Sequence, residues 1–227
     1  MKVEQVEGAQ ADAFRERIVE ASLSLIEELG LGALSMREVA RRAGVSHQAP
    51  YHYFADREAI LGAIAEQGFR LLREGISAAT AIQGGGLTDA LVRAGESYIR
   101  FAFTHPSHFR VMFRRELVQM ERHEGLKAEG DRACDVFYNA VKRAVEAGLP
   151  ADESVDALFL LCWSIGHGLA CLVLDGPLEV VMPGQDREQQ MHQVLSTFAR
   201  LVEARIALKN VSRVSTSNSR APAKKRG

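Results

Sequence analysis

The sequence has few cysteines, and no two of them are placed to act together. Three cysteines are too few for a disulfide framework. Cys162 and Cys171 are nine residues apart, about half a turn out of phase on an ideal helix, so they cannot share a metal ion. His105 and His108 would share a helix face, but no third ligand stands near them. We therefore expect neither a metal nor a cofactor.

Strand and enzyme signals are also scarce. Runs of Val, Ile and Thr with period two are missing, while Ala, Leu, Glu and Arg dominate, so the composition predicts an all-helical protein. The chain has no G-x-S-x-G elbow, phosphate-binding glycine loop or H-E-x-x-H pair. We expect that the protein is not an enzyme.

An apolar signal segment is missing from the N-terminus, which with the sparse cysteines predicts a cytoplasmic protein. Ala157–Leu174 is the one membrane-like run, with 18 residues and no formal charge while His167 is neutral. Asp156 and Asp175 flank it, and basic anchors are lacking. We interpret it as a buried helix of a soluble protein.

The charge is unevenly distributed. The net charge is -1, yet six basic residues and no acidic ones follow from Lys209 onward, so the remainder carries -1 - 6 = -7. This aperiodic, polar segment, 209–227, is predicted to be a disordered basic tail that either adds non-specific DNA affinity or only aids solubility.

The segment Leu34–Leu61 organises the rest of the chain. Ser35 with Glu38 three residues later forms a capping-box pattern, and Gly44 ends the short helix that they begin. Ser46 is predicted to cap a second helix and Asp56 a third. Two helices joined by a short glycine turn predict a DNA-reading helix-turn-helix.

This segment resembles a known family. A-x-x-A-G-V-S followed by Y-x-Y-F-x-D-R-E-x-I-L is similar to the DNA-binding domain of TetR/AcrR-type regulators, over about Phe14–Leu61 without a gap. Two positions depart from the family pattern: Pro50 stands where leucine is usual, and Arg57 where lysine is usual. Pro50 lies where its ring would crowd the Ser46 carbonyl in a regular helix.

The resemblance implies a set of DNA-contacting residues: Ser35, Arg37, Ser46, His47, Gln48, Ala49, Tyr51, His52, Tyr53 and Arg57. Their chemistry suits the role. Glutamine can bond adenine through two hydrogen bonds, and an alanine methyl can contact thymine. Arginines near helix starts favour phosphate. The alternative for the aromatic members is a core position, which we accept for Phe54.

Helical periodicity continues through the chain. We expect helices over the following approximate ranges: Ala13–Leu29, Asp56–Ala81, Leu87–Thr104, Asp131–Ala147, Glu153–Leu174 and Asp186–Leu208. Residues 1–11 are expected to fray, and Gly125 and Gly130 to mark a turn. The predicted domains are a DNA-binding domain (1–61), a ligand-binding and dimerisation domain (62–208) and the tail (209–227).

A second motif lies in the apolar helix. Trp163-Ser-Ile-Gly-His167-Gly resembles the WHG type of C-terminal ligand domain found in one branch of the family. We expect a mostly apolar pocket lined by some members of one aromatic-rich set: Phe101, Phe109, Met112, Phe113, Phe137, Trp163 and His167. An ordinary packed core would give the same pattern, and both interpretations stay open here.

The last predicted helix carries an apolar stripe that we expect at a homodimer interface: Met191, Leu195, Phe198, Leu201 and Val202. The resemblance then implies a transcriptional repressor that binds an inverted-repeat operator in double-stranded DNA and leaves it when a small, mostly apolar effector binds. The alternatives are a dimeric DNA-binding protein that senses no small molecule, and a helical-bundle enzyme.

Overall fold

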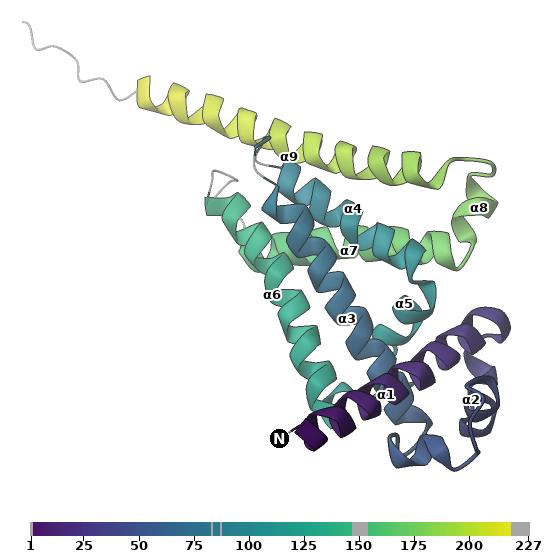
Figure 1. Cartoon of the computed structure of the whole chain (residues 1–227). Helices are drawn as coiled ribbons and strands as arrows, with labels where there is room; N and C mark the ends of the chain where they lie inside the picture. Colours follow the sequence, from purple (N-terminus) through teal and green to yellow (C-terminus); the bar gives the residue numbers. More distant parts are fainter. Residues whose placement is uncertain (1, 83, 87, 147–153, 219–227) are drawn as a thin grey trace, which may run out of the picture. The chain divides into compact units, whose positions relative to one another are not determined.

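The computed structural model describes residues 2–82, 84–86, 88–146 and 154–218, and within them it contains helices and no strand. Figure 1 shows their arrangement along the chain. Short 3₁₀ helices are labelled η. The elements are α1 (Lys2–Leu29), η1 (Leu31–Ala33), α2 (Met36–Arg42), η2 (Ala49–His52), α3 (Arg57–Ala81), α4 (Asp89–Thr104), α5 (Pro106–Met112), η3 (Met120–Arg122), α6 (Glu124–Glu146), α7 (Val155–Leu174), α8 (Pro177–Val181) and α9 (Arg187–Asn218). The prediction of an all-helical protein is confirmed.

The chain divides into two compact units. The first unit is Met1–Gly75 with Arg100–Cys134, and the second is Ile76–Ile99 with Asp135–Gly227. This division follows packing, and it differs from the boundary after Leu61 that the sequence predicts. Helices α3, α4 and α6 each contribute residues to both units. The boundary between DNA-binding and ligand-binding segments stays a prediction about function.

The core of the first unit explains why its N-terminal segments fold as they do. α1, α2 and α3 each bury one apolar face, at three- and four-residue spacing. The largest of the fully buried side chains in these segments are Ile18, Leu25, Ile26, Val39, Phe54, Ile60, Leu61 and Ile64. The Ser35 hydroxyl accepts the Glu38 backbone N–H at 3.3 Å and so begins α2 as predicted.

Three helices extend beyond their predicted ends. α1 begins at Lys2 rather than near Ala13, and α9 continues to Asn218 rather than ending at Leu208. The prediction of disorder from Lys209 is therefore wrong up to Asn218, and 219–227 lie outside the described residues. Neither extension contains a proline, and nothing in either forces the backbone out of the helix. Polarity alone predicted fraying, but polar residues are compatible with a helix.

The third of these helices, α6, begins at Glu124, so Gly125 and Gly130 lie inside a helix instead of marking a turn. Packing supplies the reason. A Cβ at Gly125 would lie 2.6 Å from a carboxylate oxygen of Glu66, and one at Gly130 would lie 3.3 Å from Met120 Cε. These glycines therefore admit neighbouring side chains close to the helix backbone.

α7 is less buried than the sequence analysis expects. It is long and apolar enough to span a membrane by length and composition, a test that core helices of soluble proteins also pass. One face packs inward through Leu158, Leu169 and Val173. Leu160, Leu161 and Leu172 of the same helix are exposed. Ser154 accepts the Asp156 N–H and begins the helix; the predicted start, Glu153, lies outside the described residues.

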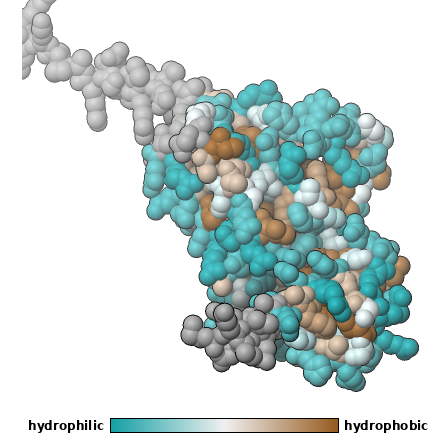
Figure 2. Space-filling model, in the orientation of Figure 1, coloured by the Kyte–Doolittle hydropathy of each residue, from teal (hydrophilic) through white to brown (hydrophobic). Residues whose placement is uncertain are grey.

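α8 is a short helix that the sequence analysis missed. Gly176 has a positive φ of 88° and turns the chain into it, and Pro177 occupies its first position. Val180 and Val181 are exposed at 83% and 76%. The face of the molecule shown in Figure 2 is mostly hydrophilic, with hydrophobic residues gathered in small patches.

We predict that Gly68→Ala destabilises the protein. A Cβ there would lie 2.5 Å from Met112 Sδ and 3.2 Å from His108 Cβ, and both neighbours are buried. Overpacking of about 1 to 3 kcal/mol should exceed the gain of about 1 kcal/mol from helix propensity. Denaturant unfolding measures the difference. Gly166→Ala is the matched control, since its Cβ would meet only Tyr98, at 3.6 Å, and it should be neutral or stabilising. Equal stabilities for the two variants would contradict the packing.

Candidate functional site

The segment predicted as the second helix of the helix-turn-helix is a 3₁₀ helix, η2, rather than an α-helix. Backbone N–H groups of Ala49, Tyr51 and Tyr53 donate to carbonyls three residues earlier, at 3.0, 3.1 and 3.0 Å. Pro50 has no N–H to donate to Ser46, the carbonyl that an α-helix would use. The Ser46 carbonyl accepts from Ala49 instead. The missing donor thus accounts for the tighter helix.

Tight winding determines which side chains face outward. In a 3₁₀ helix residues three apart lie above one another. Pro50 is buried and Tyr53, three residues on, is half-buried, so this line faces the protein. Gln48, Tyr51 and His52 are exposed. Ser46 and His47, which precede η2, are also exposed, and Ala49 is half-buried. Most of the predicted DNA-contacting residues of this segment are therefore exposed to solvent.

Two predicted contacts have structural partners within the protein. The half-buried Arg57 guanidinium donates to the Leu31 carbonyl at 2.9 Å and so ties α3 to η1. The Tyr53 ring stacks on Phe14 of α1, with ring centroids 4.6 Å apart. Both side chains hold the domain together, which sequence reasoning did not foresee because the partners lie more than twenty residues away in the chain. The hydroxyl of Ser35 caps α2.

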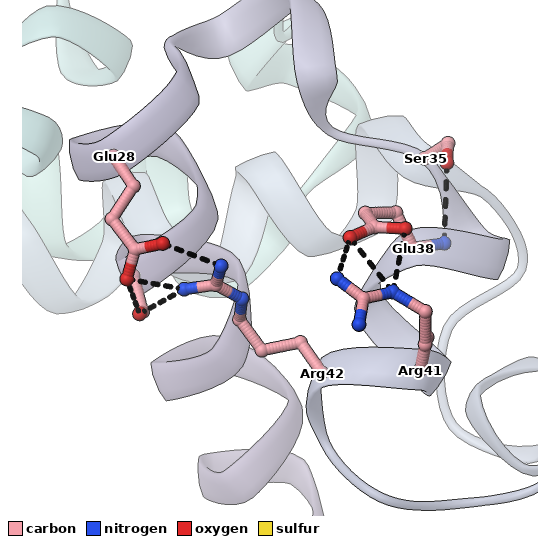
Figure 3. A network of polar contacts seen from close by, with 6 residues as sticks. Glu28, Ser35, Glu38, Arg41 and Arg42 are labelled. Carbon is pink, nitrogen blue, oxygen red and sulfur yellow. Dashed lines mark hydrogen bonds and ion pairs between the residues drawn. The ribbon is translucent and has the colours of Figure 1, made fainter.

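Two arginines of α2, Arg41 and Arg42, form ion pairs with glutamates (Figure 3). Arg42 donates to both carboxylate oxygens of Glu28 at 2.6 Å, and Arg41 pairs with Glu38 on its own helix. The Arg42 guanidinium lowers the pKa of Glu28 below the ordinary value for a glutamate. The Arg41 guanidinium does the same for the pKa of Glu38. Arg37 is exposed, and within the described part of the chain no ion-pair partner faces it. Arg37 is therefore the α2 arginine whose charge is available to a phosphate.

The predicted pocket residues divide between the two units, one set in each. In the first unit Phe113 meets Phe69 and Phe109 edge-on, at 5.6 and 5.3 Å between ring centroids. Phe101 stacks on His105 at 5.1 Å. Met112 is buried beside Gly68, whose missing side chain makes room for it.

A buried histidine adds polarity to this first group. His108 bonds Gln67 through Nε2 at 3.0 Å and lies edge-on to His105 at 5.6 Å. Burial, and to a lesser extent the neighbouring His105, lower the pKa of His108 to about 4. His108 is therefore neutral at physiological pH and works as a hydrogen-bonding core residue.

The second group lies along α7. Phe159, Trp163 and His167 follow at four-residue spacing, with neighbouring rings 6.1 and 6.3 Å apart. Phe137 of α6 meets Phe159 at 5.4 Å. Sequence reasoning missed Phe159, although its position one turn before Trp163 would have identified it.

A polar relay crosses this second group. Trp163 Nε1 donates to the Tyr98 hydroxyl oxygen at 3.3 Å, and that hydroxyl bonds His167 Nδ1 at 2.8 Å. Tyr98 is buried, and burial raises its pKa. Burial likewise lowers the pKa of His167. The relay holds three side chains in one arrangement, and all three remain neutral at physiological pH.

The predicted interface residues on α9 differ in exposure. Met191 and Leu195 are buried within the chain, and Leu195 lies against Gly95, where an added Cβ would be 3.0 Å from its Cδ2. These two residues therefore pack inside the protomer, a correction to the prediction that they meet a partner. Phe198 and Val202 are half-buried, and Leu201 is exposed at 67%. Helical periodicity shows that a stripe is apolar but not which neighbour covers each position.

Two family models match this chain. One, described as bacterial regulatory proteins of the tetR family, matches residues 18–64. The other, described as a tetracyclin repressor-like C-terminal domain, matches residues 91–198.

Curated relatives match in the N-terminal part. The HTH-type transcriptional regulator BetI of Pseudomonas fluorescens is 34% identical over 64 residues, which is 28% of this chain and 32% of that protein. BetI of Stenotrophomonas maltophilia is 31% identical over 77 residues, 34% of this chain and 39% of that protein. The chain thus spans about a third of the length of the curated relatives it matches.

Solved structures share the fold over most of the chain. The TetR-family regulator PfmR of Thermus thermophilus superposes with a TM-score of 0.65 at 23% identity, over 81% of this chain and 97% of that one. A Rhodococcus protein of unknown function gives a TM-score of 0.68 at 26% identity, over 82% and 93%. The matched families are regulators, which sets aside the helical-bundle enzyme. With a helix-turn-helix at 18–64 and a C-terminal match over 91–198, the chain belongs to the TetR family of transcriptional regulators.

Proposed function

We propose that the protein is a dimeric repressor that binds an inverted-repeat operator and leaves it when a small, mostly apolar effector binds the C-terminal domain. The observation that carries this proposal is the exposure of Gln48, Tyr51 and His52 in and next to η2, together with that of Arg37 on α2. Such a combination offers groups for base edges and a cation for phosphate.

The exposed side chains suit different parts of a DNA duplex. The Gln48 amide can donate to and accept from adenine in the major groove. The Tyr51 ring is 45% exposed and lies 5.9 Å from the His47 ring, so the pair can pack on a sugar and bond a phosphate. Arg37 supplies charge without sequence preference. In this proposal Arg57 and Tyr53 support the surface instead of touching DNA.

A second copy of the chain is the proposed cover for the exposed apolar faces of α7 and α9. Leu160, Leu161 and Leu172 on α7 and Val194 and Leu201 on α9 are each at least 40% exposed. Two α7–α9 pairs related by a two-fold axis would bury these side chains against their own copies. Two-fold symmetry in the protein also matches an inverted repeat in the DNA.

Effector release requires that the ligand bind the non-DNA conformation more tightly. The proposed site is the aromatic group of Phe159, Trp163 and His167, since it combines flat apolar surfaces with a fixed polar relay. The proposed lever is α3, which has residues in both units. Near its first turn Glu58 accepts the Gln119 backbone N–H at 3.2 Å, so the segment before α6 also holds the start of α3. A shift of α3 would change the spacing of two recognition segments.

A dimeric DNA-binding protein that senses nothing is the competing candidate. In that case both aromatic groups are packed core and no small molecule alters DNA binding.

We predict specific operator binding that depends on Arg37 and Gln48 but not on the charge of Arg57. Arg37→Ala should weaken binding to all sequences and reduce the slope of log K against log salt by about one. Gln48→Ala should change base preference at a cost of about 1 to 3 kcal/mol at one position. Arg57→Ala is the comparison: it should lower thermal stability and leave the slope unchanged. Fluorescence anisotropy against the chain's own promoter and random DNA measures all three, and equal affinity for both DNAs at physiological salt rules out a specific operator.

We predict that Leu201→Glu separates the dimer without unfolding the protomer. Leu201 is exposed in the single chain, so the new charge costs little until a partner approaches. The dimer dissociation constant should rise by about tenfold or more. Leu195→Glu is the control, since it puts a charge inside the protomer and should unfold it. Analytical ultracentrifugation and circular dichroism separate the two effects, and a monomeric wild-type mass at micromolar concentration would refute the dimer.

We predict that an inducer, found by screening small apolar and aromatic compounds for operator release, lowers DNA affinity by roughly 5- to 150-fold. Trp163 is the only tryptophan, so its fluorescence should change on binding. His167→Ala should weaken inducer binding by about fivefold or more, through loss of a buried hydrogen bond. Phe113→Ala tests the other aromatic group and should leave inducer affinity as it is. If Phe113→Ala weakened inducer binding and His167→Ala did not, the inducer site would lie in the first unit instead.

A further inference from the structure

The recognition segment Ser46–Phe54 is held less firmly from within than an α-helical one. Pro50 removes one donor, and the hydrogen bonds at Ala49, Tyr51 and Tyr53 are of the 3₁₀ type, whose geometry is poorer. Only the Phe54 N–H reaches a carbonyl four residues back, that of Pro50, at 2.9 Å. The carbonyl end of the segment also lies at a turn, with α3 beginning at Arg57.

An external brace lies at this carbonyl end. The Arg15 guanidinium donates through Nη1 to the Tyr53 carbonyl at 2.9 Å, and its central carbon lies 4.6 Å from the centre of the Phe54 ring. On the same helix Phe14 stacks on Tyr53 with an interplanar angle of 29°. α1 therefore contacts two consecutive residues of the segment, Tyr53 and Phe54, through one hydrogen bond and two ring contacts. We call these contacts the brace.

This brace lies directly behind the surface that meets DNA. Tyr53 follows Tyr51 and His52, so any movement of its carbonyl moves these exposed side chains. The Arg15 guanidinium contacts both the Tyr53 carbonyl and the Phe54 ring, and these two contacts fix its orientation.

We propose that Arg15 is a positioning residue for DNA recognition: it fixes the carbonyl end of the recognition segment and thereby replaces the order that the missing Pro50 hydrogen bond would give. The proposal rests on the proposed DNA-binding function, and it adds a residue outside the DNA-facing surface. Its consequence is a coupling between two positions 35 residues apart in the chain, Arg15 and Pro50.

The coupling has a clear physical basis. Pro50→Leu restores an N–H that can donate to the Ser46 carbonyl, and leucine has a high helix propensity. In that background the segment can hold itself as an α-helix. The brace should then matter less. A direct contact between Arg15 and a DNA phosphate predicts no such dependence on position 50.

The test is a double-mutant cycle on the full-length protein with operator DNA. Wild type, Arg15→Ala, Pro50→Leu and the double variant are titrated over a range of salt concentrations. Arg15→Ala should lower operator affinity about tenfold in the wild-type background, the size expected for loss of a charge-assisted hydrogen bond. The loss should fall below about twofold in the Pro50→Leu background, and the salt slope should not change. Thermal unfolding checks that each variant is folded.

Two matched variants keep the result interpretable. Phe14→Ala removes the ring contact without removing charge, and it should weaken operator binding in the same background-dependent way. Arg132→Ala removes one exposed arginine that pairs with Glu129 on α6, and it should leave operator affinity unchanged. An equal loss on Arg15→Ala in both backgrounds, with a salt slope reduced by about one, would assign Arg15 to a phosphate and overturn the proposal.

Backbone amide hydrogen exchange in the free protein tests the brace without DNA. Arg15→Ala should speed exchange at Tyr53 and Phe54 in the wild-type background and have little effect in the Pro50→Leu background. Unchanged exchange at these amides overturns the brace. If wild type bound no operator, the proposed function would fail, and exchange would still decide whether Arg15 orders the segment.

Discussion

Helix α3 contributes buried side chains to the cores of both units, so its sequence must satisfy the packing of each. α3 spans Arg57–Ala81 and buries Ile60, Ile64 and Leu72 along one side, with Ile76 already in the second unit. Gly68 lets Met112 approach the helix backbone halfway along. A continuous hydrogen-bonded helix transmits displacement better than a loop does, because its turns cannot move independently. The recognition segment precedes α3 directly, so its position follows that of the helix.

Pro50 changes the local structure of the proposed DNA-contacting surface, and its neighbours remain exposed. The segment, which lacks the Pro50 N–H, is a 3₁₀ helix, and Arg15 and Phe14 of α1 contact its carbonyl end. The charges of α2 are also fixed by neighbouring side chains. Arg42 is tied to Glu28 and Arg41 to Glu38, so these pairs set the surface while Arg37 keeps an accessible charge.

The second unit combines a partly buried polar relay with exposed apolar side chains. The Trp163–Tyr98–His167 hydrogen bonds satisfy polar groups that burial would otherwise penalise. Leu160, Leu161 and Leu172 on α7 are exposed in the described part of the chain. The same helix therefore has both buried and exposed leucines, which its uniformly apolar sequence cannot distinguish.

The helical class, most helix positions, the Ser35 cap and the helix-turn-helix can be read from local patterns, because periodicity, capping and turn residues act over a few neighbouring positions. Other features depend on packing between distant segments. It turned Arg57 towards Leu31, placed Met191 and Leu195 inside the protomer, kept Gly125 and Gly130 in a helix, and divided the expected pocket residues between two units. Each of these outcomes depends on contacts between distant segments, and a local pattern carries no information about which distant surface will cover it.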